Sequence, residues 1–129
     1  MTPVLYALTA VILLAIFQVS ISSIVTLKAA GPKWVLGPRD RGFDVPGASG
    51  RIVRAHRNLL EILPQFIGVV ACVHFADSVS ALSAWGAWTF VAARVLYIPA
   101  YVSAIPWLRP ICWQIALFGL LAVLADAFV

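Results

Sequence analysis

Four polar side chains recur at helical spacing in the stretch RIVRAHRNLLEILPQF. Arg51, Arg54, Asn58 and Glu61 are three, four and three positions apart, which places them on one face of a helix. Guanidinium groups bind carboxylates, and a carboxylate such as Glu61 binds an ammonium group. The pattern therefore predicts a binding face for a small zwitterionic or anionic molecule.

A second polar face is predicted further along the chain. Arg94, Tyr97 and Tyr101 are three and four positions apart, which again makes one stripe on a helix. Arg94 stands within an apolar run, where a charge needs a partner, so it is expected to face a carboxylate such as Glu61 or an anionic ligand. Together the two faces would supply cations, one carboxylate, an amide and phenols.

A simpler interpretation needs no ligand. The arginines would extend toward the lipid headgroups, and Glu61 would pair with Arg57 at i, i+4. Arg51 and Arg57 fit either interpretation. Asn58 and Glu61 have short side chains, and Glu61 lies ~15 Å along a helix from Arg51, which favours a polar cavity within the membrane.

The elements that carry these faces are apolar segments of membrane-spanning length. Hydrophobic residues make up 63% of the 129 residues, and charged residues 11%. Strands are not expected, since the segments are long and do not alternate. Each segment approaches the ~20 residues that a helix needs to cross a bilayer. The sequence predicts one all-α domain, residues 1–129, with four transmembrane helices over Pro3–Leu27, Leu59–Phe75, Val79–Ala104 and Trp107–Val129.

The second segment reaches that length only if the polar stretch before Leu59 belongs to the same helix. Ser49 is expected to be its N-cap. The connection before it, GPKWVLGPRDRGFDVPGASG, is rich in helix-breaking residues and is expected to be a loop. In the first segment, Gln18 is costly to expose to lipid and is expected to face another helix.

The basic residues are distributed unevenly along the chain, whose net charge is +4. Seven lie in or beside the first connection, and Arg94 and Arg109 lie toward the third; the second has none. This distribution places both termini outside the cytoplasm. Neither a nucleic-acid-binding module nor a metal site is visible. Cys72 and Cys112 are expected to be small buried hydrophobic residues.

Two stretches of the chain form recognisable motifs: the pattern RxxRAHxNxxExxP over Arg51–Pro64 and the sequence ARVLYIPAYVSAIPWLRP. Both resemble the MAPEG superfamily, the membrane-associated proteins in eicosanoid and glutathione metabolism. The resemblance implies a four-helix bundle that assembles as a homotrimer, with glutathione bound between neighbouring subunits near the cytoplasmic face. The chain is similar to bacterial members related to the microsomal glutathione transferases.

The resemblance also implies roles for individual residues. Arg109 matches the arginine that stabilises the thiolate, if a shift of one residue is allowed. Ile62 and Leu96 stand where eicosanoid-forming relatives have a tyrosine and a second arginine, so the leukotriene-forming reaction is not implied. The residues implied to bind glutathione are Arg51, Arg54, Asn58, Glu61, Arg94, Tyr97 and Tyr101.

The expected function is that of a glutathione-dependent transferase or peroxidase. Glutathione would be the co-substrate, and hydrophobic electrophiles would enter from the lipid of a bacterial inner membrane. The alternative is a non-catalytic membrane protein that binds lipid or another ligand, or a small subunit of a larger membrane complex. The polar face favours the enzyme, while the shifted position of Arg109 keeps the alternative open.

The charge distribution makes a direct prediction about topology. A reporter that is active only in the cytoplasm, fused to the C-terminus, should be silent, because the positive-inside rule places that end outside. Reporter activity in intact cells measures this. An active C-terminal fusion would overturn the orientation.

Overall fold

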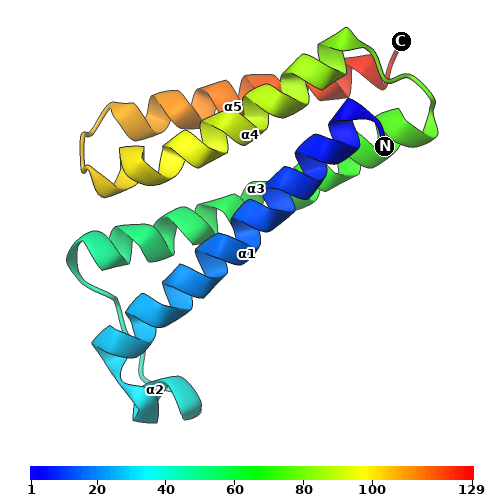
Figure 1. Ribbon diagram of the computed structural model, residues 1–129. Coiled ribbons are helices and arrows are strands. Elements are labelled where there is room, and N and C mark those ends of the chain that lie inside the picture. Colours follow the sequence, from blue (N-terminus) through cyan, green and yellow to red (C-terminus); the bar gives the residue numbers. More distant parts are fainter.

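A computed structural model describes all 129 residues. The protein has five helices and no strand (Figure 1). Four of the helices are long and apolar enough to cross a membrane, which confirms the predicted all-α architecture. The fifth is short and lies in the first connection. The helices are α1 (Pro3–Ala30), α2 (Pro32–Leu36), α3 (Gly47–Phe75), α4 (Ala81–Val102) and α5 (Leu108–Asp126).

The polar head of the second segment belongs to the same helix as its apolar part. α3 is continuous from Gly47 to Phe75, so Arg51 and Glu61 stand on one helix, as their spacing predicted. The predicted cap was wrong, since Pro46 occupies the N-cap position and Ser49 lies inside the helix. The chain enters α3 through Gly47, whose φ of 64° favours glycine, so the helix begins before Ser49.

The first connection is more ordered than predicted. It contains α2, and the indole Nε1 of Trp34 on this helix donates a hydrogen bond of 2.7 Å to the carbonyl oxygen of Arg41. Trp34 also packs against Phe43, with ring centroids 5.7 Å apart. These contacts fold the connection back on itself below the end of α1 (Figure 1).

The long helices associate as two pairs, α1 with α3 and α4 with α5 (Figure 1). Apolar side chains from all four form the main core, and Phe66 of α3 stacks on Phe90 of α4 with ring centroids 4.1 Å apart. Gln18 of α1 is 3% exposed, which confirms that it faces protein and not lipid. The core therefore joins the two pairs.

Two glycines allow the backbones of α4 and α5 to approach closely. A Cβ placed on Gly119 would lie 2.6 Å from the carbonyl oxygen of Gly86 and 2.8 Å from the backbone nitrogen of Phe90. A Cβ on Gly86 would lie 2.7 Å from the carbonyl oxygen of Gly119. Small residues at such a crossing let membrane helices gain van der Waals contact that larger residues would prevent.

The carboxylate of Asp126 on α5 caps the N-terminus of α4. Oδ2 of Asp126 accepts hydrogen bonds from the backbone N–H of Ser83 at 3.0 Å, from the backbone N–H of Ser80 at 3.3 Å and from the Ser80 hydroxyl. Backbone N–H groups at a helix start have no partner within the helix, and a negative charge there is favourable. Asp126 thus fixes the end of α5 against the start of α4.

The bundle has two unlike ends (Figure 1). Both termini lie at the end where α4 begins and α5 finishes. Toward the opposite end, α3 diverges from the α4–α5 pair, and the connections Ala30–Gly47 and Val102–Leu108 lie there. The polar residues singled out in the sequence belong to this diverging end.

The close contact at Gly119 predicts that replacing glycine by alanine lowers stability there but not at an open position. Gly119→Ala should lower the free energy of unfolding by about 1–3 kcal/mol, because the added methyl group overlaps the backbone of α4. Gly68→Ala on α3 is the matched control, since a Cβ there meets nothing within 4 Å. It should be neutral or stabilising by up to about 1 kcal/mol. Thermal unfolding in detergent measures both variants. Equal effects would show that the close approach of α4 and α5 does not restrict the size of the side chain at position 119.

Candidate functional site

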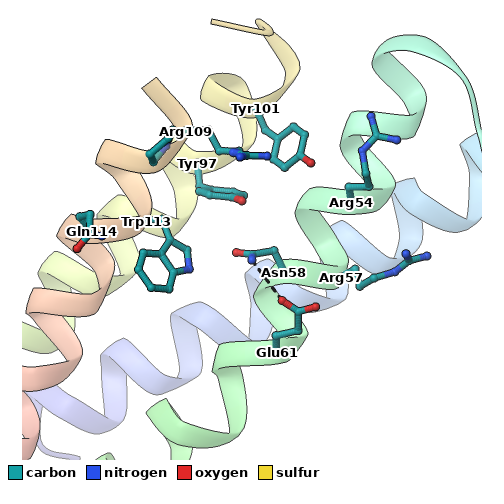
Figure 2. A pocket seen from close by; sticks show the side chains of 10 residues that line it. Arg54, Arg57, Asn58, Glu61, Tyr97, Tyr101, Arg109, Trp113 and Gln114 are labelled. Atoms are coloured by element: carbon teal, nitrogen blue, oxygen red, sulfur yellow. Dashed lines mark hydrogen bonds between the residues drawn. The ribbon is translucent and has the colours of Figure 1, made fainter. Parts of the chain in front are cut away.

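A cavity of about 440 Å³ lies at the diverging end, between α3 and the α4–α5 pair (Figure 2). All three helices of a single chain contribute to its wall, and most of the lining side chains are polar. The lining residues are Arg54, Arg57, Asn58, Glu61, Tyr97, Tyr101, Arg109, Pro110, Trp113 and Gln114.

Three of the four residues predicted to share one face of α3 line the cavity. Arg54, Asn58 and Glu61 stand on successive turns, and all three reach the cavity. Arg57 also lines it, although its guanidinium is turned away from Tyr97 toward the rim (Figure 2). The Arg57–Glu61 pair of the simpler interpretation is not formed; Glu61 Oε2 instead accepts a hydrogen bond of 3.3 Å from Nδ2 of Asn58.

Two tyrosines of α4 form the opposite wall. Tyr97 is almost fully buried, and its ring meets that of Tyr101 edge to face with centroids 5.6 Å apart. Tyr101 stands between two arginines, since the guanidinium carbons of Arg54 and Arg109 lie 5.9 and 5.0 Å from its ring centroid. A cation above an aromatic face is attracted by the ring's charge distribution. Tyr101 therefore helps to hold both arginines at the cavity.

Arg94 lies behind the cavity wall and does not line it. It is 1% exposed, and its Nη1 donates a hydrogen bond of 3.0 Å to Oδ1 of Asn58. The expected direct partner, a carboxylate or a bound anion, is thus replaced by the Asn58 amide. Its guanidinium carbon also lies 4.3 Å from the ring centroid of Tyr97.

The burial of Arg94 is costly for the fold. Its Nε and Nη2 atoms are buried and make no hydrogen bond, and each unpartnered group costs about 1–3 kcal/mol. Helices α3 and α4 of one chain nevertheless shield this charge.

Arg51 is separated from the other residues of its predicted face. Its Nε donates a hydrogen bond of 3.0 Å to the carbonyl oxygen of Val102, at the end of α4. It lines a smaller cavity of about 240 Å³, which shares only Tyr101 and Arg109 with the main one. Arg51 thus connects α3 to α4 beside the site.

An apolar cavity of about 480 Å³ adjoins the polar one. The two share the side chains of Asn58, Glu61 and Trp113. Beyond these shared residues, the second cavity continues between α3 and α5 along Ile62, Gln65, Leu117 and Leu120. A molecule with one polar and one apolar part can occupy both.

Sequence reasoning missed the contribution of α5 apart from Arg109. Pro110, Trp113 and Gln114 belong to an apolar segment with no polar spacing of its own, so no local pattern marks the face that α5 turns toward α3. Gln114 offered the one signal, since an amide in such a segment is expected to face protein and not lipid.

The chemistry of the cavity is that of an anion site with one opposing charge. Arg54, Arg57 and Arg109 supply three cations, Glu61 supplies one carboxylate, and amide and phenol groups stand between them. No group of three or more His, Cys, Asp or Glu side chains lies close enough to hold a metal ion. The arrangement suits a small molecule that carries carboxylates and an ammonium group.

The family model described as the MAPEG family matches residues 4–129, almost the whole chain. The chain belongs to the MAPEG family. Its four apolar helices and its family make it an integral, multi-pass membrane protein. Comparisons with curated proteins and with solved structures gave no match. MAPEG members include glutathione transferases and peroxidases as well as proteins without catalytic activity.

Proposed function

We propose that this MAPEG protein is a membrane-bound, glutathione-dependent transferase or peroxidase that acts on hydrophobic electrophiles. The observation that supports this most is the shared wall of the two cavities. A polar cavity with three arginines and one carboxylate opens beside an apolar cavity that continues between α3 and α5. A polar thiol and an apolar electrophile would meet at Asn58, Glu61 and Trp113.

The polar cavity would bind glutathione group by group. Glutathione carries two carboxylates and one ammonium group, and the cavity carries an excess of cations over its single carboxylate. Arg54 and Arg57 on α3 would bind carboxylates, and Glu61 would bind the ammonium group. The Asn58 amide and the phenols of Tyr97 and Tyr101 would bind the peptide groups between them.

Arg109 would activate the thiol. A nearby cation lowers a thiol pKa from its free value of about 8.5, and the thiolate is the nucleophile. An arginine stays charged at any working pH, so it favours the thiolate without titrating itself. In a transfer reaction the thiolate sulfur would form a bond to the electrophilic carbon while the leaving group departs with its electron pair.

The assembly and its placement are part of the proposal. We propose a homotrimer in a bacterial inner membrane, with both termini outside the cytoplasm. Large apolar side chains remain exposed along α1, such as Leu13, Ile16 and Phe17, and they need lipid or a second copy against them. Native mass spectrometry of the detergent-solubilised protein counts the copies, and a mainly monomeric species would count against the trimer.

Calorimetric titration of the purified protein with glutathione and with S-hexylglutathione tests the function. Both ligands should release or absorb heat and raise the melting temperature, and the S-hexyl ligand should bind more tightly because its chain can enter the apolar cavity. Absence of heat and of thermal stabilisation with either ligand would favour the alternative, a non-catalytic lipid or ligand binder or a small subunit of a larger complex.

Glu61→Gln should weaken glutathione binding about tenfold, because it keeps the side chain's shape but removes the charge that faces the ammonium group. The oligomer should stay intact. Calorimetry measures the affinity, and size-exclusion chromatography in detergent checks the assembly. If glutathione binds unchanged to Glu61→Gln and also to Arg54→Ala, the polar face has only a structural role.

Arg109→Ala should lower turnover more than it weakens glutathione binding, because the cation at the mouth of the cavity acts on the thiolate. The pKa of the bound thiol should rise by about one unit. The ultraviolet absorbance of the glutathione thiolate, followed against pH, measures this shift. If absorbance and turnover are unchanged, Arg109 only anchors the start of α5 at the membrane surface.

A further inference from the structure

The Asn58 amide lies between two groups of opposite hydrogen-bonding character. Nη1 of Arg94 donates to Oδ1 of Asn58 at 3.0 Å, and Nδ2 of Asn58 donates to Oε2 of Glu61 at 3.3 Å. A guanidinium group can only donate, and an ionised carboxylate can only accept. Turning the amide over would set its NH₂ group against the guanidinium and its oxygen against the carboxylate. Asn58 therefore has one favourable orientation.

Arg94 is placed to impose that orientation. It comes from α4, is 1% exposed and stacks on Tyr97, which is itself 3% exposed. Neighbouring side chains thus restrict its movement. Arg94 is absent from the cavity wall, whereas Asn58 and Glu61 both line it. The contact with Asn58 is the one hydrogen bond that Arg94 makes to a residue of the cavity wall, and its other contact there is the ring of Tyr97.

We propose that Arg94 is a positioning residue that acts through Asn58. It occupies the amide oxygen, so that Asn58 presents only N–H groups toward Glu61 and the cavity. One N–H then holds the Glu61 carboxylate, and the other is free for an acceptor oxygen of the ligand. The cavity thus offers a hydrogen-bond donor, Asn58, beside an acceptor, Glu61. This arrangement fits a ligand that carries a carboxylate or carbonyl oxygen next to a cationic group.

A ligand-free measurement can test this placement, because Asn58 is the only asparagine in the chain. Labelling with ¹⁵N-asparagine gives the signals of a single side-chain amide in detergent micelles. In Arg94→Met the chemical shifts of the two amide hydrogens should move toward those of free asparagine, and the amide should become more mobile. Arg94→Lys keeps a charged donor on a side chain of different length, so the chemical shifts should move part of the way.

Phe90→Leu is the control for a general loosening of the structure. Phe90 packs α4 against α3 through its stack on Phe66, and it takes no part in the Arg94–Asn58 contact. Its substitution should leave the Asn58 signals in place. The proposal is overturned if neither Arg94 variant moves them, or if Phe90→Leu moves them as far as Arg94→Met does.

A binding cycle tests whether Arg94 acts through Asn58, and this part rests on the proposed function. Glutathione affinity is measured for Arg94→Met, Asn58→Ala and the double variant. The double variant should bind within about twofold of Asn58→Ala alone, because removing the amide removes the route by which Arg94 acts. Fully additive losses would contradict the proposal. If the wild-type protein binds no glutathione, the proposed function fails, and the Asn58 signals still decide the role of Arg94.

Discussion

The close backbone contact between α4 and α5 at Gly86 and Gly119 is the constraint on which the rest of the structure depends. In lipid, helices gain little from burying apolar surface against one another, so their association needs close packing and hydrogen bonds. Gly86 and Gly119 supply the packing, and Asp126 supplies hydrogen bonds at the start of α4. The two helices thereby form one unit, which fixes Tyr101 of α4 relative to Arg109 of α5.

The two ends of the bundle differ in how α3 contacts α4. In the main core, apolar side chains and the Phe66–Phe90 stack pack the two helices together. At the diverging end, they meet through hydrogen bonds from Arg51 and Arg94 and through a smaller apolar cluster that includes Ala55 and Tyr97. A ligand that binds beside these contacts would stabilise this end by mass action.

Much of the fold and part of the site could be predicted because the relevant signals are local. Length and hydropathy gave the four spans, and helical spacing gave the faces that carry Asn58 and Tyr97. The rest depends on how helices pack. Spacing could not show that Arg94 would contact an amide in place of a carboxylate, or that Arg51 would turn toward the end of α4. The cap formed by Asp126 joins groups far apart in the sequence, so no local sequence pattern predicts it.

The same cap has a consequence for how the protein is made. Ser80 and the carboxylate that receives its hydrogen bonds are 46 positions apart. Until the last turn of α5 has been synthesised, the first turn of α4 is therefore capped only by its own Ser80 and Ser83 side chains. Helix α4 is expected to gain the hydrogen bonds of Asp126 last, after α1 and α3 have already entered the bilayer.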